Sequence, residues 1–137
     1  MRLLARYFTV TLLMASFLGA QEQFVGKWVG TTETVDDVNV HRYERHTIEL
    51  KIESGKLVAG QVSRNGASSP MEVQVDGNKL NLYRFLPLDG GEPLRWKLEL
   101  KDGKLVGVYQ CTHHNPAKWQ YDRTGAITLT KEDAGAK

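Results

Sequence analysis

The segment Thr47-Ile-Glu-Leu-Lys-Ile-Glu-Ser-Gly-Lys-Leu-Val58 decides the fold, because it contains two short strands and the turn that joins them. Ile48, Leu50 and Ile52 alternate with polar residues, and this alternation is typical of a strand with one buried face. Ser54-Gly55 then interrupts the alternation with residue types that favour a tight hairpin turn. The sequence therefore predicts an antiparallel hairpin here.

The same pattern returns 48 residues later as Arg95-Trp-Lys-Leu-Glu-Leu-Lys-Asp-Gly-Lys-Leu-Val106, with Asp102-Gly103 as its turn. Asp76-Gly77 supplies a third tight turn between alternating stretches. Further alternating apolar sets are Met71, Val73, Val75; Leu80, Leu82; and Ile127, Leu129. Residues after the N-terminal segment show no convincing helical period, so the fold is predicted to be all-β.

The turns sort into two groups along the predicted strands. These strands cover residues 24–33, 42–53, 56–63, 70–75, 79–85, 94–101, 104–112 and 119–131. In up-and-down order, the three tight turns lie at one end and longer loops, near 34–41, 64–69, 86–93 and 112–118, lie at the other. This layout predicts an eight-stranded up-and-down antiparallel β-barrel with one closed and one open end; a two-sheet β-sandwich is the alternative.

The first 20 residues are predicted to be a secretory signal peptide rather than part of the fold. Arg2 and Arg6 precede an apolar stretch from Tyr7 to Leu18, and Ala20 offers a small residue for cleavage. The stretch is too short to span a bilayer, and no second apolar run follows it. Residues 21–131 then form one β-barrel domain and residues 132–137 a flexible tail, in a secreted or periplasmic protein.

Charge and cysteine content exclude several classes of function. The chain has 18 Lys and Arg against 16 Asp and Glu, and removing the predicted signal peptide with its two arginines makes the charges equal. A balanced charge gives no support for binding nucleic acid. Cys111 is the single cysteine, so no disulfide forms within the chain, and it is expected to be a small apolar residue of the barrel wall.

The sequence contains no complete catalytic signature and no convincing metal site. His113 and His114 are adjacent, so on a strand they would point to opposite faces, and no third ligand stands at metal-site spacing. His46 and Glu44 resemble an acid–base pair, but no nucleophile or oxyanion-hole motif accompanies them. No cofactor is therefore expected, and an enzyme ranks third among the possible functions.

A polar and aromatic layer is predicted on the inward face near the open end. On each strand, some residues share the inward face with the apolar residues but lie nearer the open end. These positions, in the upper half of the barrel, are the candidates for ligand binding. The candidate residues are Glu44, His46, Arg84, Trp96, Tyr109, Trp119, Tyr121 and Arg123.

Inward-facing arginines are costly to bury unless they pair or meet an anion. One interpretation is a small-ligand site, in which Arg84 and Arg123 bind a carboxylate, phosphate or sulfate between aromatic walls. The other is a structural network, in which Glu44 pairs with both arginines and fills the barrel. The sequence leaves both open.

Gly26-Lys27-Trp28, at the start of the first predicted strand and before a meander of hairpins, resembles the calycin group of lipocalins, avidins and small secreted lipocalin-like domains of bacteria. The resemblance implies that Trp28 closes the barrel floor and stacks with a basic residue at the end of the last strand, for which Lys131 is the candidate. It also implies a barrel that binds a ligand or a protein partner, and fold alone does not choose between them.

These observations predict a barrel that binds a small, partly apolar and anionic molecule at its open end. The alternative is an interaction or inhibitor module that binds a protein partner through the long loops.

Overall fold

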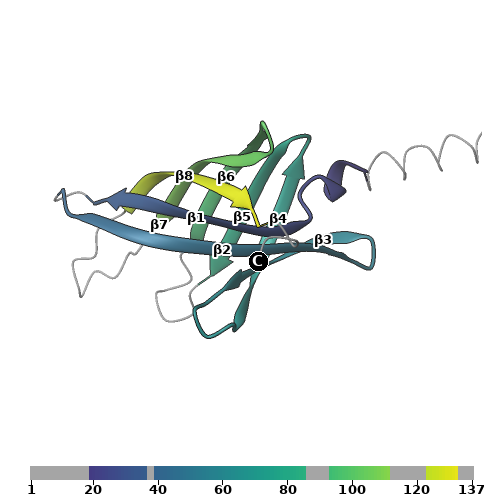
Figure 1. Cartoon of the computed structure of the whole chain (residues 1–137), viewed down its shortest axis with the longest axis horizontal. Coiled ribbons are helices and arrows are strands. Elements are labelled where there is room, and N and C mark those ends of the chain that lie inside the picture. Colours follow the sequence, from purple (N-terminus) through teal and green to yellow (C-terminus); the bar gives the residue numbers. More distant parts are fainter. Residues whose placement is uncertain (1–18, 37–38, 86–92, 112–122, 133–137) are drawn as a thin grey trace, which may run out of the picture.

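Eight antiparallel strands close into a barrel in the computed structural model, which describes residues 19–36, 39–85, 93–111 and 123–132. The strands are β1 (Gly26–Val35), β2 (His41–Glu53), β3 (Lys56–Val62), β4 (Ser68–Asp76), β5 (Lys79–Phe85), β6 (Pro93–Lys101), β7 (Lys104–Cys111) and β8 (Arg123–Lys131) (Figure 1). Each strand pairs with its neighbour in sequence, and β8 pairs with β1. The predicted up-and-down barrel is confirmed, and the sandwich alternative is wrong.

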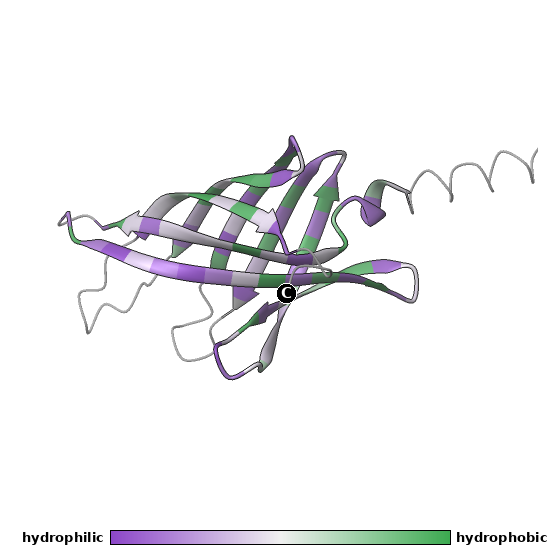
Figure 2. Cartoon of the chain, in the orientation of Figure 1, coloured by the Kyte–Doolittle hydropathy of each residue, from purple (hydrophilic) through white to green (hydrophobic). Residues whose placement is uncertain are grey.

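The alternating apolar residues fill the barrel, as the period of the strands requires. Figure 2 shows apolar and polar bands following one another along the strands. The most deeply buried apolar side chains come from all parts of the chain: Phe24, Trp28, Ile48, Leu50, Leu80, Leu82, Trp96, Leu105, Ile127 and Leu129. Burial of such large side chains is the main favourable contribution to folding.

Tight turns connect the strands at the closed end. Ser54 and Gly55, and likewise Asp102 and Gly103, all have positive φ, as a type I′ hairpin turn requires. The turn between β4 and β5 is Gly77-Asn78, one residue later than predicted, because Asp76 still pairs with Lys79. All three turns connect the strand ends that the sequence assigned to one end of the barrel.

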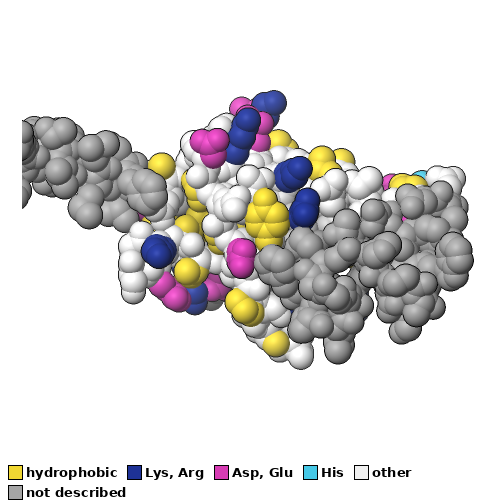
Figure 3. Space-filling model, turned by 180° about the vertical axis from the view of Figure 1, so that it is seen from behind, with side chains coloured by type: hydrophobic (Ala, Val, Ile, Leu, Met, Phe, Trp, Pro, Cys, Tyr) yellow, Lys and Arg dark blue, Asp and Glu magenta, His cyan; other side chains and the backbone are white. Residues whose placement is uncertain are grey.

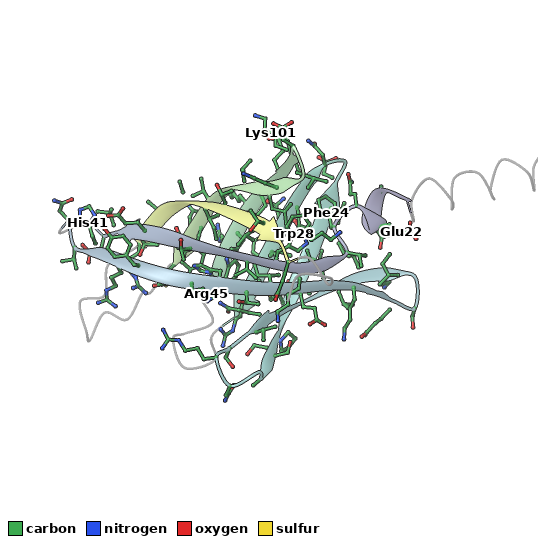
Figure 4. The ribbon with its side chains drawn as sticks, in the orientation of Figure 1. Glu22, Phe24, Trp28, His41, Arg45 and Lys101 are labelled. Atoms are coloured by element: carbon green, nitrogen blue, oxygen red, sulfur yellow. The ribbon has the colours of Figure 1, made fainter. Side chains whose placement is uncertain are left out.

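The closed end is plugged by residues that precede β1. The sequence predicted that the first strand begins at residue 24, but β1 begins at Gly26, and a short helical turn covers residues 19–22. Phe24 is completely buried, and its carbonyl accepts a 2.8 Å hydrogen bond from Trp28 Nε1. Gln23 Nε2 donates to Gly77 O at 2.9 Å and so ties the plug to the β4–β5 turn. Phe24 and Trp28 lie together at this end in Figure 4.

Lys131 covers Trp28 at the end of β8, as the calycin resemblance implied. Its ammonium nitrogen lies 5.6 Å from the centroid of the Trp28 ring, within the range of a cation–π contact. The two residues are also paired across the β1–β8 ladder.

Glycines and a buried threonine allow β1 and β8 to close the barrel. A Cβ at Gly30 would overlap the carbonyl oxygen of Thr128, and a Cβ at Gly125 would overlap that of Glu33. Thr32 is buried beside this seam and donates a 2.7 Å hydrogen bond to Ala126 O. The close approach of the two backbones therefore depends on residues without a side chain.

The open end differs from the prediction in its connections. The connections expected near 34–41 and 64–69 are shorter than predicted, because β1 extends to Val35, β2 begins at His41 and β4 begins at Ser68. Backbone hydrogen bonds join Asp36 to Val40 and Ser63 to Ala67. The other two predicted loops fall wholly or largely outside the described residues, as do residues 119–122 of the last predicted strand. Within the described part of the chain, no helix is long and apolar enough to cross a membrane.

Replacing Trp28 with alanine should lower the free energy of unfolding by roughly 3–5 kcal/mol, because a buried aromatic side chain leaves a cavity that the barrel cannot collapse. Urea denaturation measures the loss. Tyr43→Ala is the matched control: this aromatic side chain is 77% exposed, so its loss should cost less than about 1 kcal/mol. Equal losses in the two variants would contradict the placement of Trp28 in the core.

Candidate functional site

Most of the predicted site residues that the structure describes do lie on the inward face near the open end. His46, Trp96 and Tyr109 are buried, while Glu44, Arg84 and Arg123 are partly exposed. Trp119 and Tyr121 lie outside the described residues, as do His113 and His114.

His46 forms the centre of a buried aromatic cluster with Trp96 and Tyr109. Its ring centroid lies 4.5 Å from that of Tyr109 and 5.9 Å from that of Trp96, both in edge-on geometry. Trp96 Nε1 donates a 3.3 Å hydrogen bond to His46 Nδ1. Because the indole nitrogen can only donate, Nδ1 must be the acceptor and the proton of the neutral ring is on Nε2.

The proton on His46 Nε2 has no hydrogen-bond partner among the described residues, although the atom is fully buried. The nearest carboxylate oxygen, Glu44 Oε2, is 3.9 Å away, too far for a hydrogen bond. Burial lowers the pKa of His46 from 6.5 to about 4, because the charged ring would lose its hydration. The ring is therefore a neutral donor at neutral pH, which suits a ligand or water that accepts.

Arg123 forms a second group of contacts beside this cluster. Its Nη1 donates to Glu44 Oε1 at 3.3 Å, and its Nη2 lies 3.3 Å from Cys111 Sγ. Partial burial disfavours the charged guanidinium, but the bond with Cys111 and the charge of Glu44 outweigh it, so the pKa of Arg123 is raised. Arg123 is therefore engaged by this chain's own groups, and it is one of the two arginines that the network interpretation paired with Glu44.

Cys111 and Tyr109 complete the interior wall. Cys111 is a free thiol with 1% of its surface exposed, in agreement with the prediction that it is a buried wall residue. Burial, followed by the neighbouring Cys111 and Glu44 groups, raises the pKa of Tyr109, so its hydroxyl stays protonated.

Arg84 is separate from this network, contrary to the interpretation in which Glu44 pairs with both arginines. Its Nη1 donates to Gln61 Oε1 at 2.7 Å, and no carboxylate in the described part of the chain forms an ion pair with it.

Arg84 lines a half-open pocket of about 850 Å³ between β2 and the β3–β4 hairpin, and we call this pocket the groove. Its lining residues are Tyr43, Glu44, Arg45, Thr47, Gln61, Val62, Ser63, Arg64, Ser69 and Arg84. The groove carries three arginines, and its one carboxylate, Glu44, is already paired with Arg123. The arrangement is cationic and suits an anionic occupant.

The sequence found two of these lining residues and missed the others. Arg45 lies on the outward phase of β2 and Arg64 lies in a turn, so following the inward phase of the strands does not lead to either residue. His46, Trp96, Tyr109 and Arg123, which were predicted to surround the ligand, lie in the barrel interior and do not line the groove. No spacing in the sequence indicates that β2 and β3 separate here.

Metal chemistry finds no support in the described residues. No group of three or more His, Cys, Asp or Glu side chains there is arranged to hold a metal ion. His46 in particular has its Nδ1 lone pair directed to Trp96 and a proton on Nε2, so neither nitrogen is available as a ligand.

Comparisons with models of protein families, with curated proteins and with solved structures found no match to this chain.

The lowered pKa of His46 predicts a loss of stability in acid. Below pH 6.5 the unfolded chain takes up a proton that the folded His46 does not, so the free energy of unfolding falls as pH drops toward 4. The total fall from this residue is roughly 3 kcal/mol. His46→Gln does not titrate, yet can accept from Trp96 Nε1, so urea denaturation from pH 7 to 4 should show a weaker dependence. An unchanged dependence would contradict the burial of a neutral His46.

Glu44 and Arg123 should behave as a coupled pair. Arg123→Met should cost about 1–3 kcal/mol, because it leaves the Glu44 carboxylate partly buried without its partner. Adding Glu44→Gln should recover most of that loss. Urea denaturation of the two single variants and the double variant measures the coupling. Strictly additive losses would show that the ion pair contributes nothing to stability.

Proposed function

We propose that this protein binds a small, partly apolar, anionic molecule in the groove at the open end of the barrel. The observation that carries the proposal is the cationic lining of the groove, where Arg45, Arg64 and Arg84 face a volume of about 850 Å³ and no described carboxylate forms an ion pair with them. That volume lies within the range typical of small-ligand pockets. Arg84, half-buried and held by Gln61, is the best placed to bind a carboxylate with both guanidinium nitrogens.

The remaining lining residues suit a ligand with an apolar part. Tyr43 and Val62 offer apolar surface, and Gln61, Ser63 and Ser69 offer neutral hydrogen-bonding groups. A ligand with a carboxylate on a short aromatic or alkyl body would use both. Glu44 sets an electrostatic limit on the site, because a second carboxylate on the ligand close to it would be repelled.

We also infer that the protein is a secreted or periplasmic member of the calycin group. The closed eight-stranded barrel is compatible with that architecture, and the Gly26-x-Trp28 motif and the Trp28–Lys131 contact support the inference. Arg2 and Arg6, followed by an apolar stretch, support a signal peptide over residues 1–20.

Benzoate and octanoate should bind to the wild-type protein, and Arg84→Met should weaken their binding by about 10- to 100-fold. This factor corresponds to the 1.5–3 kcal/mol that a hydrogen bond to a charged group contributes. Isothermal titration calorimetry at low salt measures the effect. Arg95→Met is the matched control, because Arg95 is an exposed arginine of β6 outside the groove, and its loss should leave affinity unchanged.

Two results would contradict the proposal. Absence of binding by both carboxylates at millimolar concentration would show that the groove is not a site for this class of anion. Equal effects of Arg84→Met and Arg95→Met would show that binding reflects the general surface charge. Urea denaturation of each variant verifies that the fold survives.

A further inference from the structure

The half of β2 nearest the open end has one edge that no described strand pairs with. β2 pairs with β1 from His41 to Leu50, but it pairs with β3 only from Ile48 to Glu53. Residues 41–47 therefore have a partner strand on one side only, within the part of the chain that the structure describes. Along such an edge, every second residue directs its backbone N–H and C=O groups away from the sheet.

The β3–β4 hairpin turns away from this edge instead of covering it (Figure 1). Beyond Gln61, β3 pairs with β4 and not with β2, through Gln61 with Ser69 and Val62 with Ser68. The hairpin tip uses its polar groups internally: Ser63 N donates to Ala67 O at 2.9 Å, and Ala67 N donates to Asn65 Oδ1 at 3.0 Å. The tip therefore forms a separate wall and does not extend the pairing with β2.

The groove follows the edge of β2 rather than one of its faces. Successive β2 residues line it, including Glu44 on the inward phase and Tyr43 and Arg45 on the outward phase. Only an edge brings residues of both phases to one surface. The groove begins where the pairing of β2 with β3 stops. Ile48 with Gln61 is the last pair toward the open end, and Thr47, Gln61 and Val62 line the groove.

We propose that this edge accepts an extended acidic segment of a partner protein as an added strand between β2 and the β3–β4 hairpin. The backbone groups of residues 41–47 would bind the segment's backbone, a mode that gives affinity with little dependence on sequence. Charge selects the occupant. Arg45 stands on the outward phase beside the added strand and Arg84 on the inward side, so acidic side chains on either face of the segment meet an arginine.

Tyr43 provides an aromatic contact at the same edge. Tyr43 lines the groove and is 77% exposed, and its hydroxyl donates to Glu33 Oε1 of the paired strand β1 at 3.2 Å. An exposed aromatic side chain fixed by a hydrogen bond beside an open edge is typical of a contact residue in protein interfaces. Figure 4 labels His41 and Arg45, which lie along this half of β2.

Other surfaces of the described structure offer fewer features that point to a docking site. On the face drawn in Figure 3, the described basic, acidic and apolar side chains are interspersed, so that view shows no patch of one kind. The edge of β2 joins an unpaired backbone, a preformed wall and a net positive lining.

A capped heptapeptide of alternating glutamate and valine is the probe, and its control carries N-methyl groups on every second residue, prepared in both phases. Fluorescence anisotropy should show binding of the unmethylated peptide and at least a tenfold loss for one methylated phase, because methylation removes the donors that pair with β2. Because all the glutamates of this peptide lie on one face of the added strand, either Arg45→Met or Arg84→Met should weaken binding several-fold, and Arg95→Met should not.

Amide hydrogen exchange reports on the edge directly. In the free protein, one alternate set of amides within residues 41–47 should exchange fast, and the peptide should slow that set at least tenfold. Benzoate should not slow the exchange of these amides. The two ligands compete for one groove, but the exchange rates test strand addition and the calorimetric titration tests small-anion binding, so one proposal can fail while the other holds.

Three results would overturn the proposal. Slow exchange of all amides of residues 41–47 in the free protein would show that another part of this chain covers the edge. Equal binding of the methylated and unmethylated peptides would show that only charge attracts them. No binding of the heptapeptide would show that the arginines merely protect an open edge from pairing.

Discussion

The pairing of β1 with β8 is the constraint on which the rest of the structure depends. Without it, the meander would be an open sheet with two long edges, and the alternating residues would have no enclosed interior to fill. Closure requires close approach at Gly30 and Gly125, where a side chain would overlap a backbone carbonyl. The buried Thr32 then satisfies its hydroxyl with Ala126 O across the same seam. The β1–β8 ladder therefore decides which face of each strand points into the barrel, and the burial patterns described above follow from it.

Closure divides the interior into two layers with different chemistry. The layer near the tight turns is apolar and is sealed by Phe24 and Trp28, whose side chains exclude water from that end. The layer above it contains a neutral histidine, because Trp96 occupies its Nδ1 and burial opposes its protonation. Beside it, Arg123 and Glu44 neutralise each other. Among the described residues, the interior around His46 is therefore polar with little net charge, whereas the arginines that line the groove form no ion pair with a described carboxylate.

The groove results from unequal strand lengths. β2 is 13 residues long and follows β1 to the open end, whereas β3 is seven residues long and separates from β2 after Gln61. The separation exposes a strand edge and brings Arg45, Arg64 and Arg84 to a common opening. A small anion and an acidic strand would use the same charges but different backbone groups, so the two proposed activities can be separated by experiment.

The sequence by itself determined the strands, their order and their inward phase. These features follow from local causes, namely the period-two alternation of apolar and polar residues and turn residues with positive φ such as Asp102-Gly103. Of the two arginines that the network interpretation paired with Glu44, the structure pairs Arg123 and not Arg84.

Only the tertiary structure decided where the charged groove lies. Arg45 lies on the outward phase of β2 and Arg64 lies in a turn, so nothing in the local sequence joined them to Arg84. Their proximity depends on where β3 leaves β2, which is beyond the pair of Ile48 with Gln61. Where two strands separate depends on interactions between segments that are distant in the sequence. The alternation of residues along either strand is the same whether the strands stay paired or separate.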